Sequence, residues 1–313
     1  MRYFFTSPPL IGIDIQSSAI RIAQLKKIAG GYLVEQAGAA DLPEGVMTDD
    51  RVRDWSCITE VLSKLVHTYG LRGLAAAVSL PVSLVRMQYV ALPCGMPQAA
   101  IESEIHAQVQ KDFPGMRDAL CVDFKIGPES SAGDPDVFFV AARREYVTQY
   151  MNAVNAAGLN LKIVDIDIHA LERVLDMAAY GPGLNREAHA IVYVIREAVS
   201  LLIFWNDEIL FHQHWARAEA DENLAQLSSR IHLFHAAFPG KSISVLGCYS
   251  PDGHLESRLC ALQEKWKPQV RCLKPFSRLL PGASLNEKWD QEYMTEFFVA
   301  CGSAMREIPP WQP

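Results

Sequence analysis

The sequence predicts an α/β protein with two domains that share one plan, the first of which carries a small insert. The main observation is that a series of three strands, a helix and a further strand occurs twice, starting near residues 10 and 189. A second observation is the cluster of chain breakers at Gly181–Asn185, which separates the two series. The length of 313 residues also suits two domains of about 150 residues. We therefore expect domains over residues 1–180 and 187–290.

The first series has the order of a known folding unit. Three strands are expected at residues 10–15, 19–27 and 31–43, because short apolar or alternating runs are separated by turn residues. An apolar stripe then predicts a helix over 57–69, capped by Ser56, and a buried strand follows at 74–81. This order is the first half of a ribonuclease-H-like domain, the unit from which actin-like proteins are built.

An apparent insert interrupts the first domain after Pro81. Its expected elements are a strand, an amphipathic helix and a strand, at residues 83–93, 97–114 and 119–127. The helix places Ile101, Ile105 and Val109 on one stripe. We interpret the insert as residues 82–127. The strand at 136–143, and then a helix, a strand and a helix at 145–157, 161–168 and 170–179, complete the first domain.

The second domain repeats the plan in a shorter form. Strands are expected at 190–195, 198–205 and 208–215, followed by helix, strand, helix and strand at 222–238, 242–247, 255–266 and 270–275. The repeat is too long for a solenoid and indicates a duplicated domain. We expect the last helix, 291–306, to pack back on the first domain.

Composition and charge exclude several classes of protein. The formal net charge of -7 disfavours a nucleic-acid partner, because an acidic surface repels phosphates. The most apolar stretch, 189–205, contains Arg196 and Glu197 and is too short to span a membrane. The N-terminal residues lack the features of a signal peptide, so we expect a cytoplasmic protein with reduced cysteines.

Four motifs in the same order resemble those of the PilM family of type IV pilus assembly proteins. They are GIDIQSSAIRIAQL at 12–25, MQYVALPCGMPQAAIESEIHAQVQKDFP at 87–114, VFFVAARREYVTQYMNAVNAAGLNLKIVDIDIHAL at 137–171 and CGSAMR at 301–306. The resemblance implies an actin-like fold with a nucleotide cleft between the domains. It also implies that a groove between the first domain and its insert binds the N-terminal cytoplasmic tail of a membrane-anchored partner, PilN. The membrane is then contacted only through this partner, in a platform that serves pili or DNA uptake.

The resemblance places a phosphate loop at the first hairpin. The turn and the hydroxyls of Ser17 and Ser18 can donate hydrogen bonds to an anion, and Asp14 is placed to hold a magnesium ion through water. Gln16 stands where the family has a glycine, which restricts the approach of phosphate, and Arg21 replaces a lysine. Alternatively, this segment is an ordinary hairpin with a structural aspartate.

The other two nucleotide motifs of the family are degraded. The second hairpin has Tyr193–Ile195, or residues 194–196 in a shifted register, where relatives have an aspartate and a glycine. The adenosine motif retains one glycine, Gly247, and the chain is too short here for the subdomain that covers adenine. We therefore predict a relic site that holds no cofactor and no catalytic residue, although weak binding of ATP and magnesium is left open.

Other clusters of polar residues carry weaker hypotheses. A zinc site built from His212, His214, His232 and His235 is conceivable, but ordinary surface histidines explain these residues, so no metal is predicted. Asp165 and Asp167 are expected on one face of a strand near His169, which could suggest acid–base work or a structural role.

We assign the function to the insert, which needs a reason to interrupt a complete domain. Met87, Tyr89 and Ala91 alternate along one face of its first strand before Leu92, and we predict that they form the wall that binds the partner tail as an added strand. Alternatively, they fill the core of the insert. The favoured function is a scaffold that binds this tail and can self-associate. The alternatives are an active actin-like ATPase of the same machine and the cytoplasmic part of a type II secretion platform protein.

Overall fold

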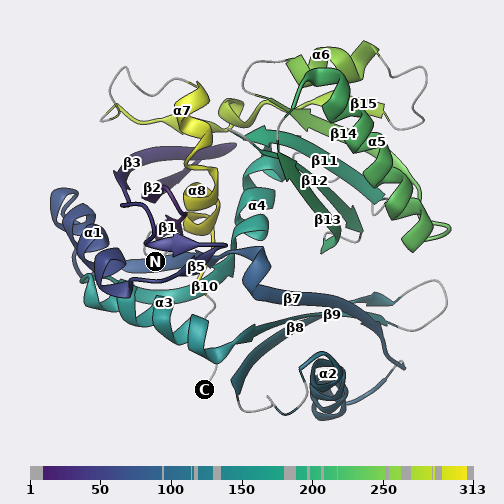
Figure 1. Ribbon diagram of the computed structural model, residues 1–313, viewed down its shortest axis with the longest axis horizontal. Helices are drawn as coiled ribbons and strands as arrows, with labels where there is room; N and C mark the ends of the chain where they lie inside the picture. The colour runs from purple at the N-terminus through teal and green to yellow at the C-terminus, as the bar shows by residue number, and fades with distance from the viewer. Residues whose placement is uncertain are drawn as a thin grey trace, which may run out of the picture.

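Two sheets and a smaller third sheet organise the molecule (Figure 1). Figure 1 shows the first sheet on the left, the second at the upper right, the helices α4 and α8 between them, and the third sheet below with α2 beneath it. The computed structural model describes residues 10–93, 95–113, 115, 119–129, 135–179, 188–195, 198–205, 208–216, 218–250, 254–261, 269–283, 285 and 291–308. None of the helices described over these ranges is long and apolar enough to span a membrane.

The first sheet contains the predicted three-strand meander. The strands β1 (Ile11–Ile15), β2 (Ala19–Ile28) and β3 (Gly31–Asp41) pair antiparallel, and β6 (Ala75–Leu80) lies parallel to β1. The short hairpin β4–β5 (Met47–Thr48 and Arg51–Val52) precedes the helix α1 (Trp55–Thr68). The prediction that Ser56 caps α1 was wrong. Asp54 is the cap, and its carboxylate accepts hydrogen bonds from the amides of Ser56 and Cys57. The reason is that the helix begins at Trp55, one residue before the predicted cap.

The remaining elements of the first domain cover this sheet. They are α3 (Arg144–Ala156), β10 (Asn160–Ile166) and α4 (Asp167–Ala179). β10 pairs with β6, which gives the strand order β10-β6-β1-β2-β3-β16. One face of the sheet packs on α1 and α3 in a core that includes Ile13, Ile58, Leu62, Tyr150 and Val154.

The second sheet repeats the strand order of the first. It contains β11 (Ala188–Ile195), β12 (Ala198–Trp205), β13 (Glu208–Ala216), β14 (Ile243–Tyr249) and β15 (Gln269–Cys272). The order β13-β12-β11-β14-β15 matches β3-β2-β1-β6-β10, with a helix at each corresponding crossover, α5 (Ala220–Ala237) and α6 (His254–Ala261). This match confirms the predicted duplication of a ribonuclease-H-like unit.

The insert is longer than predicted. It comprises the single turn η1 (Val82–Leu84), β7 (Val85–Ala91), α2 (Gln98–Asp112), β8 (Leu120–Glu129) and β9 (Pro135–Arg143). The prediction that β9 belongs to the core of the first domain, which ended the insert at residue 127, was wrong. β9 is the central strand of the sheet β7-β9-β8 and pairs antiparallel with both neighbours. Its continuous apolar run follows from this central position, which an apolar pattern cannot distinguish from a strand of the main sheet.

The last part of the chain returns to the first sheet. After η3 (Pro275–Ser277), the strand β16 (Leu279–Pro281) pairs parallel with β3, so the chain leaves the second sheet before residue 290. The expected single helix over 291–306 is two helices, α7 (Gln291–Thr295) and α8 (Phe298–Ala304). α8 packs against β1, β2, β6 and α4 of the first domain.

One apolar core joins the two domains. α4 contributes Ile168, Leu171, Val174 and Leu175, and it packs with Ile191, Tyr193 and Leu202 of the second sheet. α8 contributes Phe298, Ala300 and Cys301 to the same core, which also contains Ala23, Leu25 and Val34 of the first sheet. The two helices therefore form a shared layer between the sheets (Figure 1).

Two glycines allow α8 to lie this close to its neighbours. A Cβ atom on Gly12 would overlap the carbonyl oxygen of Ala300, and one on Gly302 would overlap the carbonyl oxygen of Ala170. We expect Gly12→Ala and Gly302→Ala each to lower the free energy of unfolding by about 3 kcal/mol or more, because backbone atoms must move apart. Urea unfolding, compared at constant m value, measures the change.

Gly45→Ala is the matched control for both variants. Its φ of +83° disfavours a side chain, but its surroundings are open, so we expect a loss of only about 1 kcal/mol. Equal losses in all three variants would show that the helix contact does not depend on the missing Cβ atoms.

Candidate functional site

The predicted phosphate loop is the tight turn between β1 and β2. The amide of Gln16 donates to the carbonyl of Ala19 over 3.1 Å, which closes the turn. Ser17 and Ser18 are exposed at its tip, while Asp14 and Arg21 are buried and lie opposite each other in the β1–β2 ladder. The structure therefore brings together the five residues that the sequence singled out at this hairpin.

The charged groups of this hairpin are already engaged by neutral and acidic side chains of the protein. The side-chain nitrogen Nε2 of Gln16 donates to Asp14 Oδ2 over 2.8 Å, and Arg21 Nη1 lies 3.5 Å from Gln16 Oε1. Nη2 and Nε of Arg21 donate to Glu296 Oε2 over 2.8 and 3.2 Å. Glu296 lies between α7 and α8. Gln16 thus links Asp14 to Arg21. Glu296, from the C-terminal part of the chain, supplies the negative charge that pairs with Arg21.

A second carboxylate, the half-buried Asp167, lies at the start of α4 and is close enough to Asp14 for their charges to interact. Asp167 Oδ1 accepts hydrogen bonds from the amides of Ile168 and Val82 over 2.6 and 3.0 Å, and the second of these connects the first turn of α4 to the start of the insert. Burial raises the pKa of Asp167 to about 8, and the charges of Asp14 and Asp50 add to this effect while the two amides oppose it.

The second domain places a phenol near Asp167. Tyr193 on β11 is buried and hydrogen-bonded to Ser200, and burial raises its pKa well above the ordinary range, with a further contribution from Asp167. The turn that follows, residues 196–197, lies outside the described residues. Gly247 lies inside β14 between β11 and β15, where a Cβ would press on the side chain of Leu273. Gly247 is therefore a strand residue and does not belong to a loop.

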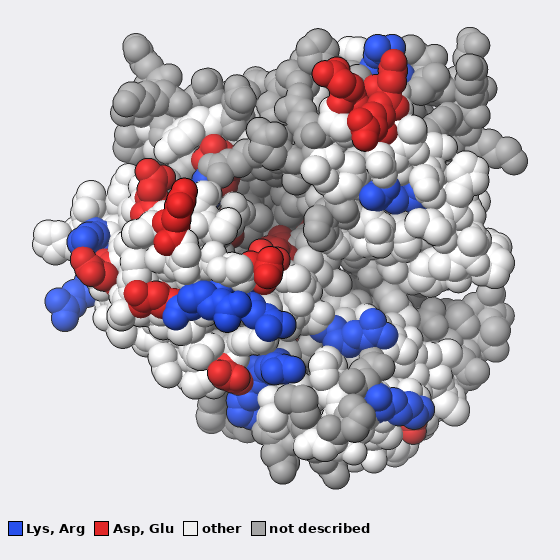
Figure 2. All heavy atoms as spheres, in the orientation of Figure 1, with Lys and Arg blue, Asp and Glu red and all other residues white. Residues whose placement is uncertain are grey.

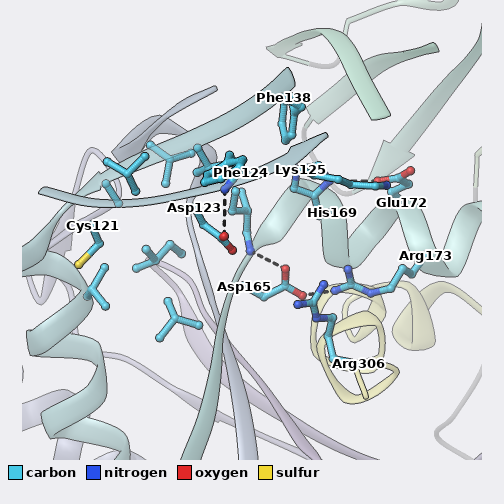
Figure 3. A pocket seen from close by; sticks show the side chains of 18 residues that line it. Cys121, Asp123, Phe124, Lys125, Phe138, Asp165, His169, Glu172, Arg173 and Arg306 are labelled. Atoms are coloured by element: carbon cyan, nitrogen blue, oxygen red, sulfur yellow. Dashed lines mark hydrogen bonds and ion pairs between the residues drawn. The ribbon is translucent and has the colours of Figure 1, made fainter. Parts of the chain in front are cut away.

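A groove of about 470 Å³ lies between the first domain and its insert (Figure 3). The insert contributes residues 121–125 of β8 and Phe138, Val140 and Ala142 of β9. The opposite wall comes from β10 and α4, and Arg306 closes one end. Figure 3 shows the side chains of Asp165, Arg173 and Arg306 gathered at that end, with His169 and Glu172 above them.

The polar side chains of the groove are arranged in pairs. Asp165 binds Arg173, which also donates through Nε to the carbonyl of Gly302 over 2.9 Å. Burial lowers the pKa of Arg173, and Asp165 opposes this effect. His169 Nδ1 lies 3.1 Å from Glu172 Oε2, and Arg306 is exposed. The groove can therefore offer both donors and acceptors to a bound chain along an otherwise apolar wall.

The predicted wall residues lie elsewhere. Met87 and Tyr89 of β7 line a different cavity of about 420 Å³, whose opposite side is Ile209–His212 of β13 in the second domain. Ala91 is exposed, and Leu92 packs in the core of the insert with Ile101, Ile105 and Val109. The reason is that β9 separates β7 from β8, so β8 is the strand of the insert that faces the first domain.

Sequence reasoning missed the residues of β8 that line the groove. Cys121, Asp123 and Lys125 alternate with the apolar residues Val122, Phe124 and Ile126. This period of two is typical of a strand with two different faces, and it was available in the sequence. The Arg173 and Arg306 contributions could not be found in this way, because they depend on how α4 and α8 pack together.

The structure also bears on the hypotheses about the aspartate pair, Asp165 and Asp167, and about a histidine zinc site. Asp165 and Asp167 do not share a strand face, because β10 ends at Ile166 and Asp167 begins α4. Asp165 lines the groove, whereas Asp167 lies near Asp14 of the hairpin. His232 and His235 contact the carbonyls of Ser228 and Lys241. Within the part of the chain that the structure describes, no group of three His, Cys, Asp or Glu residues could hold a metal ion.

Comparison with known proteins decides the family. The family described as "Type IV pilus assembly protein PilM" matches residues 12–218, which is more than half of the chain. The chain belongs to this family of type IV pilus assembly proteins. The match includes the β1–β2 hairpin, the whole insert and three of the four motifs, so it confirms the resemblance, although the motif at 301–306 lies outside the matched residues.

Solved structures agree in fold. A structure described as "PilM-PilN type IV pilus biogenesis complex" has a TM-score of 0.75 at 17% identity, covering 97% of this chain and 100% of that chain. The cytoplasmic domain of EpsL, an inner membrane component of the type II secretion system of Vibrio cholerae, has a TM-score of 0.50 at 10% identity, with 94% of each chain covered. Together with the duplicated strand order, the first of these confirms the predicted actin-like fold class.

The raised pKa of Asp167 predicts a pH dependence of stability. An acid whose pKa is higher in the folded state contributes stability at low pH, and this contribution is lost as pH rises from about 4 to about 8. We expect Asp167→Asn to flatten the decrease in the free energy of unfolding between pH 5 and 8, as measured by urea unfolding across that range. The exposed Asp41→Asn is the control. An identical slope in both variants would contradict the placement of Asp167.

Proposed function

We propose that this protein is a non-catalytic scaffold of the type IV pilus assembly platform that binds the N-terminal cytoplasmic tail of a PilN-type partner in the groove between the first domain and the insert. The groove of about 470 Å³ is the observation that supports this function best. The protein then lies in the cytoplasm and reaches the inner membrane only through its partner.

The shape and composition of the groove suit an extended peptide. β8 is ten residues long, which corresponds to about 33 Å of extended chain. Apolar side chains such as Val140, Val147 and Val164 line the groove, and polar groups are concentrated at one end. The similar solved structure is a complex of PilM with PilN, and the family match covers the groove-forming insert. We extend that partner class to this chain.

We further propose that the nucleotide site is degenerate and that the protein is not an ATPase. Phosphoryl transfer needs cations and donors that are available to the phosphates. Here Gln16 and Glu296 engage Asp14 and Arg21, and Tyr193 of the second domain lies near Asp167. These contacts favour a cleft that stabilises the domain interface over one that binds ATP and magnesium.

The surface charge favours a protein partner over a nucleic acid. The net charge is -7, and Figure 2 shows the described Lys and Arg side chains of one face in small groups separated by acidic or neutral surface. Such an arrangement does not provide the continuous positive field that binds a phosphate backbone.

Calorimetric titration with ATP and magnesium tests the degenerate cleft. We expect no binding stronger than about 1 mM, because engaging phosphates requires breaking the Arg21–Glu296 pair. Micromolar binding that Asp14→Ala abolishes would overturn this part of the proposal.

Titration with a synthetic peptide of the N-terminal residues of the PilN-type protein from the same organism tests the scaffold function. Cys121 is half-buried on the groove wall, so Cys121→Trp fills the groove and should weaken peptide binding by about tenfold or more. Gln88→Trp is the matched control, since it fills the other cavity, between β7 and β13. Thermal midpoints of both variants report folding. Loss of binding in Gln88→Trp alone would place the tail on β7.

A further inference from the structure

β8 is an edge strand that faces the proposed groove. In the sheet β7-β9-β8 it pairs with β9 on one side, and among the described residues no strand pairs with its other side. An open edge of this length would normally attract a further strand, and proteins cover such edges with side chains or loops. How this edge is covered indicates what it can bind.

Two backbone groups along the open edge are hydrogen-bonded to side chains. The amide of Phe124 donates to Asp123 Oδ1 over 2.9 Å (Figure 3), and the carbonyl of Leu120 accepts from Arg144 Nη2 over 3.0 Å. In an antiparallel strand, the backbone groups of alternate residues point toward the same neighbour. The backbone groups of Leu120, Val122, Phe124 and Ile126 therefore point toward the open edge. Asp123 and Arg144 take the positions of a neighbouring strand's carbonyl and amide.

A cavity lies on each face of this edge. Residues 121–125 line the groove toward the first domain. Val122, Phe124 and Ile126 line a second cavity of about 640 Å³ toward α2, together with Glu102, Ile105 and His106. Successive side chains of an added strand point to opposite faces of a sheet. A strand placed on β8 would therefore put alternate side chains into the two cavities.

We infer that the partner tail adds to β8 as a fourth strand and that its carbonyl replaces the Asp123 carboxylate on the amide of Phe124. This inference rests on the proposed function and specifies how the tail is held. Hydrogen bonds between the main chains of the tail and β8 supply the affinity, and the two cavities select which side chains of the tail can bind. The wall predicted on β7 shares this mode of binding but not the strand.

The cavity toward α2 indicates the chemistry of the tail. Its apolar lining residues are Ile105, Val122, Phe124 and Ile126, of which Ile126 is 47% exposed, and they lie among polar ones. Two acidic residues, Glu102 and Asp123, also line this cavity. An apolar stem with a cationic head, as in lysine or arginine, fits this combination. The occupant is thus an extended segment with a basic residue on the face toward α2, and the acidic charge of this protein favours it over a second copy of the chain.

Alternate N-methylation of the tail peptide tests strand addition. The probe is the synthetic N-terminal peptide of the PilN-type protein, titrated into the full chain as unmethylated peptide and as two peptides methylated at odd or at even residues. We expect one methylated peptide to bind about tenfold or more weakly and the other to bind about as well as the parent, because only alternate amides of an added strand face β8. The amide exchange of Phe124, followed by NMR, should slow when the parent peptide binds.

Two variants of β8 supply an independent measurement. Val122→Pro removes an amide that faces the open edge and leaves the ladder to β9 intact, whereas Val122→Ala keeps that amide. We expect the proline variant to bind the peptide about tenfold more weakly than the alanine variant. If the proline variant does not fold, the methylated peptides still give the answer.

The outcomes separate this inference from the proposed function. If the parent peptide does not bind the wild-type protein, the proposed function fails. If it binds but methylation at odd and even residues has equal effects and Phe124 exchange is unchanged, strand addition is wrong and the proposed function stands. Slow Phe124 exchange in a concentration-dependent dimer without peptide would show that the occupant is a second copy, which also overturns the inference.

Discussion

The close packing of α8 in the layer between the two sheets is the contact on which the rest of the structure depends. Gly12 and Gly302 remove the side chains that would hold this helix away from β1 and α4. Once α8 is at this distance, the hydroxyls of Ser79 and Ser303 meet over 2.6 Å inside the core. Two domains that come from one duplicated plan are thereby joined by a single apolar core, and no separate interface has to form.

The position of α8 also fixes both candidate sites. Glu296, just before the helix, reaches Arg21 in the cleft, while the carbonyl of Gly302 accepts Arg173 and Arg306 closes the end of the groove. α4 has the same double role, because Asp167 at its start lies near Asp14 of the hairpin and Arg173 lines the groove. The surroundings of the hairpin and the groove are therefore built on the same two helices.

The fold could be predicted from sequence where local pattern and global plan agree. The two meanders are separated by strong breakers and have turn residues at each reversal, so their strands and pairing follow from period and spacing. The pairing of β9 and of β16 could not be predicted. β9 is apolar along its length and suits any central strand, while β16 has three residues and gains its place only by pairing with β3. The cleft hairpin could be found from its residues, but its partner Glu296 is 275 residues away from Arg21 in the chain.

The misplaced strand explains why the sequence pointed to β7 as the tail-binding strand, whereas the groove proposed from the structure is lined by β8. If β9 belonged to the core, β7 and β8 would be neighbours and either could face the first domain. With β9 between them, β7 faces β13 and β8 faces β10 and α4. An added strand needs an open edge, side-chain space on both faces and backbone groups that are not committed to a ladder. β8 meets the first two conditions, and at Phe124 and Leu120 it meets the third through contacts that a side chain can release without breaking the sheet. In the proposed scaffold, Asp123 and Arg144 cover this edge of the free protein, and an added strand takes their place when the tail binds.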